Sequence, residues 1–307
     1  MIFKKSLIIL QLNKMKKVVI AGGTGFIGSY LAIRFLQLGY NVVIISRQPG
    51  HTSWRPKHLI KALEDSDLVI NLAGKSINCR HTKKNRQILI ESRTNSTTWI
   101  GNAIKACENP PKLWINASAS GVYQPSKFHA MTEERADFAS DFVADLVLHW
   151  ESIFLGFNLP ETRQVALRTS VVLGRDKGAL KQLAFLCRGG LGGKLGDGKQ
   201  MFSWIHIEDY FRIVLFLLEN PSIQGICNCT SPNPVMNEKL MKTLRKTLRI
   251  PFGIPTPRFA AIIGAAIIGT EPELLLNSSY LLPKILLDNG YEFLFPKIEE
   301  TLSDLLN

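Results

Sequence analysis

A glycine-rich stretch near the start of the chain constrains the fold more than any other feature. An apolar run ends at Ala21, the segment GGTGFIG occupies residues 22–28, and a helical pattern follows as far as about Gly39. A second apolar run covers residues 42–45. A strand, a glycine turn, a helix and a second strand in this order predict the βαβ unit that binds a dinucleotide. An ordinary strand-to-helix turn that uses glycine for its backbone dihedral angles is the alternative.

The glycines of this turn have separate mechanical roles. Gly22 permits a tight turn, and Gly25 lets the backbone approach a pyrophosphate because no Cβ intervenes. Gly28 lets the helix pack closely on the sheet. The phosphates would lie against free N–H groups at the positive end of the helix. The residues of the turn that we predict to bind the cofactor are Gly22, Thr24, Gly25, Phe26, Ile27 and Gly28.

The residues after the second apolar run predict which coenzyme is preferred. An NAD site would usually place Asp or Glu there, to accept hydrogen bonds from the ribose 2′-hydroxyl. This chain has Ser46 and Arg47 instead. A guanidinium suits a 2′-phosphate, because its planar fork can bind two phosphate oxygens. We therefore predict NADP(H), with NAD(H) less favoured, and a solvated loop arginine is the alternative reading of Arg47.

A third apolar run, residues 67–74, ends in the small-residue turn Leu72, Ala73 and Gly74. Small residues at a strand exit let the backbone pass close to a flat ligand, so this turn is predicted to form a wall of the cofactor site. Arg93, in the helical stretch 81–107, is assigned to the same region by resemblance to related dinucleotide-binding proteins, and a solvated helix arginine is the alternative. Val172, in the apolar stretch 171–174, completes the predicted cofactor set.

Strands and helices alternate along the first half of the chain. Helical patterns cover residues 81–107 and 138–157, and strand patterns cover 113–118 and 164–168, the latter continuing through 171–174. This alternation predicts an α/β fold: a Rossmann-type, doubly wound parallel sheet with helices on both faces. The first helix is predicted to show one apolar face, made by Phe26, Ile27, Leu31, Ile33, Phe35 and Leu36.

The remainder of the chain predicts a smaller, mainly helical C-terminal lobe that binds substrate. Residues 15–176 would form most of the nucleotide domain, and residues 206–230 would return to it as a helix and a strand. Residues 177–205 and 231–307 would form the lobe, and residues 1–14 a loose extension. Helices of the lobe are expected at residues 237–248, 257–269, 281–287 and 298–306.

Composition limits the classes of partner. The 307-residue chain carries a formal charge of +12, and its basic residues are spread out rather than interleaved with aromatics. This pattern favours small phosphorylated molecules over nucleic acid. The five cysteines have no metal-ligand spacing, so we expect free thiols, a reducing compartment and no metal site. The apolar runs at 6–10 and 259–269 are too short for a signal peptide or a bilayer span, which favours a cytoplasmic protein without membrane partners.

Several motifs together resemble a known family. They are residues 22–28, Asn71-Leu72-Ala73-Gly74, residues 118–123, residues 167–174 and Trp204-Ile205-His206-Ile207-Glu208-Asp209. These resemble the extended short-chain dehydrogenase/reductases of the NAD-dependent epimerase/dehydratase superfamily. Trp150-Glu151, the glycines of 189–198 and Leu282-Pro283-Lys284 narrow the likeness to an atypical branch, the YfcH-like epimerase family proteins. The resemblance runs from Met15 almost to the end of the chain.

The resemblance implies hydride chemistry assisted by a Ser or Thr, a Tyr and a Lys. Ser118 is the best match for the hydroxyl, with Ser120 as a register alternative. The Tyr and Lys positions carry Val143 and Val147, and residues 138–157 contain neither Tyr nor Lys. Tyr123 is the nearest phenol. It could serve as a substitute acid, or it could pack with its hydroxyl at the surface.

A second departure lies in the lobe. Sugar-nucleotide enzymes of this group often place Arg before the aromatic–His–Asp stretch, where this chain has Phe202. Cations at Arg188, Lys194 and Lys199 could still bind an anion, and the glycines among them suit a lid. His206 is expected to fix how the lobe joins the first domain, and Asp209 to cap the helix that follows.

These expectations leave three functions open. The first is an NADP(H)-dependent oxidoreductase or epimerase-like enzyme acting on an unidentified small substrate, for which an anion is compatible with the basic charge. The second is a non-catalytic NADP(H)-binding sensor or regulatory protein, which the missing Tyr and Lys favour. The third, a nucleotide-sugar epimerase or dehydratase, is weakened by Phe202. A homodimer is compatible with any of them.

Overall fold

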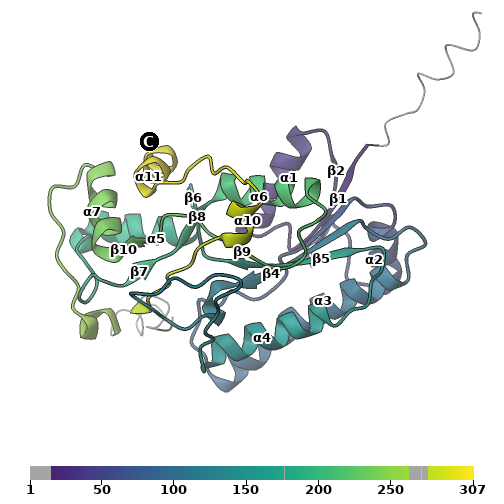
Figure 1. Cartoon of the computed structure of the whole chain (residues 1–307), viewed down its shortest axis with the longest axis horizontal. Coiled ribbons are helices and arrows are strands. Elements are labelled where there is room, and N and C mark those ends of the chain that lie inside the picture. The colour runs from purple at the N-terminus through teal and green to yellow at the C-terminus, as the bar shows by residue number, and fades with distance from the viewer. Residues whose placement is uncertain (1–14, 176, 263–270, 272–275) are drawn as a thin grey trace, which may run out of the picture.

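A computed structural model of the chain describes residues 15–175, 177–262, 271 and 276–307. Its centre is a parallel sheet of six strands in the order β2-β1-β3-β4-β5-β9 (Figure 1). The strands are β1 (Lys17–Ala21), β2 (Asn41–Ile45), β3 (Leu68–Asn71), β4 (Leu113–Ala119), β5 (Arg163–Thr169) and β9 (Gly225–Cys229). The predicted α/β, doubly wound architecture is confirmed.

Alternating side chains of the strands supply two separate cores. Val18 and Ile20 of β1 point into the core beneath α1 (Phe26–Gln37) and α6 (Ile207–Glu219). Val19 and Ala21 point to the other face. That face is covered by α2 (Pro56–Leu63), α3 (Lys83–Lys105) and α4 (Phe142–Leu155). Because both faces are covered, the strands can be apolar on both sides, as the sequence runs predicted.

The buried face of α1 differs from the prediction. Gly28, Leu31, Ala32 and Phe35 are its buried residues, while Ile33 and Leu36 are 57% and 58% exposed. The spacing of the buried set is i, i+3, i+4 and i+7, which is one helical stripe. Small residues at 28 and 32 contribute to this stripe, and a count of large apolar residues alone overlooks them.

The predicted continuous strand through residues 164–174 is also wrong. The chain leaves the main sheet after Thr169, and Ser170 separates β5 from β6 (Val171–Gly174). The backbone N–H of Ser170 still donates to Cys229 O of β9, but that of Val171 donates to Ser203 O. The strand β6 therefore pairs in parallel with β8 (Trp204–His206) in a separate two-stranded sheet.

Other elements belong to the described part of the chain. They are the short 3-10 turn η1 (Ser120–Val122), α5 (Gly178–Leu186), the π-turn η2 (Cys187–Leu191), β7 (Met201–Phe202), β10 (Val235–Met236), α7 (Asn237–Thr247), α10 (Lys284–Asp288) and α11 (Ile298–Leu306). The strands β7 and β10 pair antiparallel. The helix predicted at 281–287 begins only at Lys284, after Pro283. The one predicted at 257–269 is helical over 258–262, and its remainder lies outside the described residues, as do residues 1–14.

The glycine-rich stretch expected to form a lid packs against residues 253–256. Gly192 and Gly193 are buried, and a Cβ on Gly192 would lie 2.6 Å from Cys187 Sγ. The N–H of Ile254 donates to Gly190 O at 2.8 Å, and that of Thr256 donates to Lys194 O at 3.0 Å. Glycine here permits two backbone segments to pack against each other, and the lid stays a prediction.

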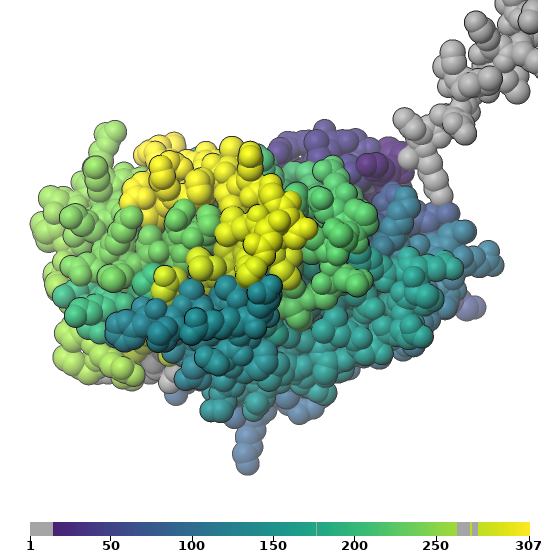
Figure 2. Space-filling view, in the orientation of Figure 1, coloured from purple at the N-terminus to yellow at the C-terminus, as the bar shows by residue number. Residues whose placement is uncertain are grey.

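The C-terminal segment, residues 284–307 from α10 to the end of α11, lies across α6 (Figure 2, yellow over green). His206 caps α6, because its Nδ1 accepts a hydrogen bond from Glu208 N at 3.0 Å. Asp209 was expected to be the cap. Instead its carboxylate accepts from the N–H groups of Leu294 and Phe295, both at 2.8 Å. Asp209 therefore fixes the C-terminal segment to the helix.

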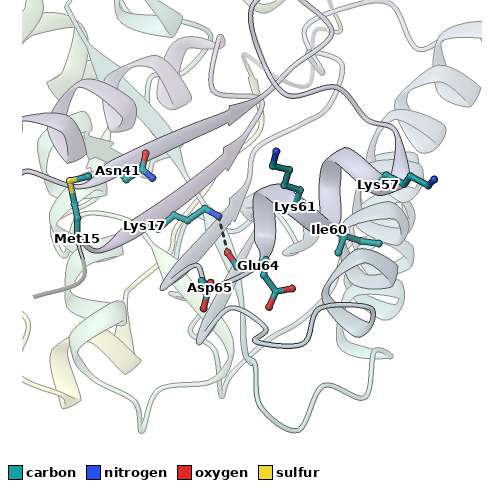
Figure 3. Close-up of a pocket in the computed structure, with 8 residues that line it drawn as sticks. All are labelled: Met15, Lys17, Asn41, Lys57, Ile60, Lys61, Glu64 and Asp65. Carbon is teal, nitrogen blue, oxygen red and sulfur yellow. Dashed lines mark hydrogen bonds between the residues drawn. The ribbon is translucent and has the colours of Figure 1, made fainter. Parts of the chain in front are cut away.

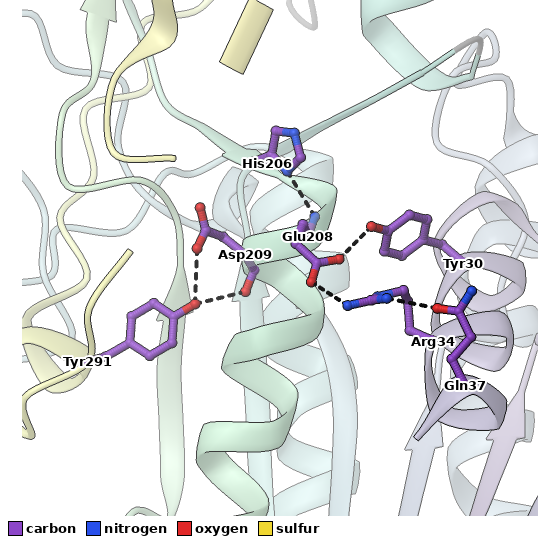
Figure 4. A network of polar contacts seen from close by, with 7 residues as sticks. All are labelled: Tyr30, Arg34, Gln37, His206, Glu208, Asp209 and Tyr291. Atoms are coloured by element: carbon purple, nitrogen blue, oxygen red, sulfur yellow. Dashed lines mark hydrogen bonds and ion pairs between the residues drawn. The ribbon is translucent and has the colours of Figure 1, made fainter. Parts of the chain in front are cut away.

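His206 also contacts the C-terminal segment directly. Its ring stacks on Phe295 with centroids 3.9 Å apart, and its Nε2 lies 3.2 Å from Asp304 Oδ2. Glu208, next but one along the chain, accepts hydrogen bonds from Tyr30 at 2.5 Å and Arg34 at 2.8 Å, both on α1 (Figure 4). The start of α6 thus joins α1 to the C-terminal segment. Within the described residues, no helix is long and apolar enough to cross a bilayer.

Candidate dinucleotide site

The glycine turn lies at the carboxyl end of β1 and is wedged between neighbouring strand exits. Gly22 has φ +77°, and a Cβ there would lie 2.9 Å from the carbonyl carbon of Leu72. Its N–H donates to Ile45 O of β2 at 3.0 Å. Only glycine allows both the backbone angle and the close approach. The turn is therefore held by the exits of β2 and β3 on its two sides.

The start of α1 rests on this turn. A Cβ on Gly28 would lie 2.5 Å from Gly22 O and 2.7 Å from Gly23 Cα. Gly28 thus lets the helix pack on the turn itself, a closer partner than the sheet that the sequence suggested. Residue 25 is the N-cap, no side chain caps the helix, and its first turn carries no acidic residue. The first N–H groups, including those of Phe26 and Ile27, have no intrahelical acceptor and are available to an anion.

The Phe26 ring joins the start of α1 to the connection between β6 and α5. A Cβ on Gly174 would lie 2.6 Å from Phe26 Cζ, and one on Gly178 would lie 2.8 Å from Cε1. The two glycines leave the space that the ring occupies. Val172, also predicted at the cofactor site, is 9% exposed and lies in β6, two residues before Gly174. Thr24 and Gly25 are exposed.

Ser46 and Arg47 lie at the carboxyl end of β2. Ser46 is buried, and its Oγ accepts a hydrogen bond from Gln48 N at 3.1 Å. Arg47 is exposed, and no hydrogen bond or ion pair engages it in the part of the chain that the structure describes. The serine thus shapes the loop, and the guanidinium remains available to a ligand.

The exit of β3 forms the neighbouring wall. Asn71 fixes it: its Oδ1 accepts from Ala73 N at 3.1 Å, and its Nδ2 donates to Asn116 Oδ1 at 2.8 Å. Leu72 abuts the glycine turn, and Gly74 is exposed. Arg93 lies against Gly74, where an added Cβ would be 3.4 Å from Arg93 Cγ. The structure thus brings Arg93 to the predicted wall.

Ser118 and Tyr123 belong to one buried polar network. Ser118 Oγ donates to Glu151 Oε1 at 2.5 Å. Arg168 holds the same carboxylate with two hydrogen bonds, at 2.8 and 2.7 Å, and donates to Tyr123 Oη at 3.0 Å. The Tyr123 hydroxyl donates in turn to Asn228 Oδ1 at 2.8 Å. None of the five residues is more than 5% exposed.

Burial sets the electrostatics of this network. It raises the pKa of Tyr123, although Arg168 and Asn228 act in the opposite direction. Burial also opposes the charge on Arg168, but Glu151 outweighs it and raises the Arg168 pKa. The idea that the Tyr123 hydroxyl lies at the surface is therefore wrong. Its role as an acid, like that of Ser118 in orienting substrate, stays a prediction.

Sequence reasoning missed Arg168 and underrated Glu151. A signal was available, because an arginine inside the apolar strand 165–168 must find a partner when the strand is buried. Val143 and Val147 lie on α4, and Val147 is 2% exposed. A Cβ on Gly121 would lie 2.8 Å from Val143 Cγ1. Both valines pack against apolar neighbours, and their assignment to the Tyr and Lys positions of the family stays a prediction.

Two hollows on the surface of the described residues lie elsewhere. One, of about 670 Å³, is lined by Met15, Lys17, Asn41, Lys57, Ile60, Lys61, Glu64 and Asp65 (Figure 3). A second, of about 690 Å³, includes Lys112, Arg163 and Gly225. Both contain residues from the amino ends of strands. Parallel sheets of this kind bind ligands at the carboxyl ends, so the glycine turn and not these hollows is the candidate site.

Comparison with known proteins gives the family. The model of the NAD dependent epimerase/dehydratase family matches residues 18–229. The chain belongs to this family. A domain of unknown function, DUF1731, matches residues 256–305. The family match covers the whole six-stranded sheet except for the first residue of β1.

Relatives match the epimerase-family chain over nearly its full length. An epimerase family protein of Staphylococcus epidermidis is 32% identical over 300 residues, which are 95% of this chain and 99% of the relative. One from Staphylococcus haemolyticus is 31% identical over 301 residues, covering 95% and 100%. These proteins carry the family name without a stated substrate.

Among solved structures, the human epimerase family protein SDR39U1 with NADPH has a TM-score of 0.85 and 32% identity, covering 94% of this chain and 98% of that one. A nucleoside-diphosphate sugar epimerase of Corynebacterium glutamicum has a TM-score of 0.75 and 27% identity, covering 96% and 60%. Thermotoga maritima UDP-glucose 4-epimerase, at 16% identity and a TM-score of 0.74, shares the fold.

Proposed function

We propose that this protein binds NADP(H) and acts as an oxidoreductase or epimerase-like enzyme on a small substrate in the cytoplasm. A bound nicotinamide supplies or accepts a hydride. In this proposal Ser118 orients the substrate, and Tyr123 or a water molecule relays the proton. The human relative solved with NADPH supports the choice of coenzyme.

One observation carries the proposal. Two anion receptors lie at neighbouring strand exits: the uncapped amino end of α1 after β1, and the exposed Arg47 after β2. A diphosphate fits the first, because free N–H groups and the helix dipole both favour it. A 2′-phosphate fits the second, because a guanidinium binds phosphate in two places. The wall at Leu72, Ala73 and Gly74 would lie beside the dinucleotide.

Direct titration tests this proposal. Calorimetry with the full chain should give an NADPH dissociation constant at least about tenfold below that of NADH, a difference of about 1.4 kcal/mol. Failure to bind either coenzyme at millimolar concentration would overturn it. NADPH absorbance should then be followed across a library of small carbonyl compounds, where oxidation by at least one class supports the enzyme.

A second candidate function is a non-catalytic NADP(H)-binding sensor. The observation in its favour is that Ser118 and Tyr123 are engaged inside the protein, with valines at the Tyr and Lys positions. Tight NADPH binding without oxidation by any compound in the library would favour this candidate. The nucleotide-sugar function has no comparable support, because Phe202 stands where such enzymes often carry Arg and lies in β7, paired with Val235 of β10.

A further inference from the structure

Arg93 is a half-buried cation that has one hydrogen bond and one aromatic ring as its described partners. Its Nη1 donates to Leu89 O at 3.1 Å, and its guanidinium carbon lies 5.4 Å from the centroid of the Trp150 ring. No ion pair holds Arg93 among residues 15–175, 177–262, 271 and 276–307. A guanidinium has five N–H donors, so most of its capacity is unused.

The environment of this side chain opposes its charge. Burial lowers the pKa of Arg93 to about 10, and only the nearby Cys79 acts in the other direction. A buried cation without a counter-ion is costly, and proteins rarely keep one without a partner. Arg168, which unlike Arg93 is fully buried, shows the usual solution, since Glu151 pairs with it in two places.

The neighbours of Arg93 fix the aromatic ring against which its guanidinium lies. Trp150 is 5% exposed, and its Nε1 donates to Thr97 Oγ1 at 2.8 Å, which fixes the ring that the guanidinium faces. Trp150 precedes Glu151, the partner of Ser118. The two residues on which we base substrate binding, Arg93 and Ser118, thus contact consecutive residues of α4.

Resting on the function proposed above, we propose that Arg93 binds a carboxylate or phosphate group of the substrate beside Gly74. The cofactor has receptors of its own for its phosphates: the start of α1 for the diphosphate and Arg47 for the 2′-phosphate. A planar guanidinium with free donors binds either oxyanion through two parallel hydrogen bonds. The substrate class is therefore a small organic acid or a phosphate ester.

The same chemistry could come from the cofactor diphosphate, so the test separates the two sources. Inorganic phosphate is titrated into the full chain at constant ionic strength, with and without saturating NADPH, and the melting temperature is recorded. The proteins are wild type, Arg93→Gln, Arg93→Lys and Lys84→Gln. Lys84 is an exposed cation on the same helix, so its variant controls for loss of one charge.

With NADPH bound, phosphate should raise the melting temperature of wild type and Lys84→Gln in a saturable manner. It should have no effect on Arg93→Gln, and Arg93→Lys should need about tenfold more phosphate, because an ammonium cannot bind in two places. All four proteins should bind NADPH within about threefold of one another. The Lys variant keeps the test valid if the Gln variant does not fold.

Two outcomes would overturn the proposal. Equal stabilisation of Arg93→Gln would place the phosphate elsewhere. The second outcome has two parts: phosphate no longer stabilises wild type once NADPH is added, and Arg93→Gln binds NADPH more weakly than wild type. Together they would assign Arg93 to the cofactor diphosphate. Failure of wild type to bind NADPH is read separately, in the coenzyme titration, and counts against the proposed function rather than against the phosphate site.

Discussion

Ser118 Oγ lies 2.5 Å from Glu151 Oε1. A serine hydroxyl has a single proton, and here that proton is directed at a carboxylate. The hydroxyl therefore meets any further ligand with its lone pairs alone. A substrate hydroxyl or N–H can donate to Ser118, whereas a carbonyl finds no donor there unless the contact with Glu151 opens. In this network Ser118 can therefore bind the alcohol form of a substrate more readily than the carbonyl form.

Removing the charge of Glu151 should destabilise the fold strongly. Glu151→Gln leaves the buried Arg168 without its counter-ion, and breaking a buried pair in this way costs about 3–5 kcal/mol. Urea unfolding followed by circular dichroism measures the free energy of unfolding. Ser152→Ala, on the exposed side of the same helix, should change it by about 0.5 kcal/mol or less. A Glu151→Gln variant as stable as wild type would contradict the ion pair.

Arg47 should select the coenzyme. Arg47→Ala is expected to weaken NADPH binding about tenfold or more, because the 2′-phosphate loses its two-point partner, and to leave NADH binding unchanged. Calorimetry with both coenzymes measures the ratio. Arg55→Ala removes a cation from the next loop and serves as control. If Arg47→Ala kept the wild-type preference for NADPH over NADH, a group other than Arg47 would bind the 2′-phosphate.

Gly28 should tolerate no side chain. Gly28→Ala would place a Cβ 2.5 Å from Gly22 O, so the helix or the turn must move. Such overpacking costs about 1–3 kcal/mol of stability, and displacement of the turn should also weaken NADPH binding. Gly189→Ala is the matched control, since nothing lies within 4 Å of a Cβ there. Thermal unfolding and coenzyme titration of the two variants should differ clearly.

His206 should make stability depend on pH. Burial lowers its pKa below the ordinary 6.5, and Asp304 opposes the shift only in part. The unfolded chain therefore binds the proton first as the pH falls below about 6.5. The stability that neutral His206 contributes is present above that pH and is lost as the pH drops toward the lower folded-state pKa.

His206→Asn tests this expectation, because Asn keeps a side chain that can cap α6. The free energy of unfolding of wild type should fall more steeply than that of the variant between about pH 7 and pH 5. Identical slopes would show that His206 has the same proton affinity in both states. His58, which is exposed, provides the comparison through His58→Asn.

The parts of the fold that follow from local patterns could be predicted from the sequence. The glycine turn depends on residues 22–28 alone, and the apolar runs around it mark the strands. The prediction that valines replace the Tyr and Lys also rests on local residues alone, Val143 and Val147. These features need no knowledge of which distant segments meet.

The rest depends on contacts between distant residues. Arg168 and Glu151 lie 17 positions apart, and their pairing follows only once β5 and α4 are packed together. Asp209 has the residue type of a cap, but residues 294 and 295 offer it backbone N–H groups, which local sequence cannot reveal. Gly192 and Gly193 suggest mobility until the segment 253–255 is seen against them.

The packing of the Phe26 ring against Gly174 and Gly178 restricts how the neighbouring elements can move. The same residue offers its backbone N–H to the expected diphosphate and its ring to the connection between β6 and α5, so it joins the start of α1 to that connection. Sliding α1 past this connection would expose the ring to water, at a cost of about 1.5–3 kcal/mol for a side chain of this size. Any motion of β6 and α5 relative to α1 should therefore pivot about residue 26 instead of shearing across it.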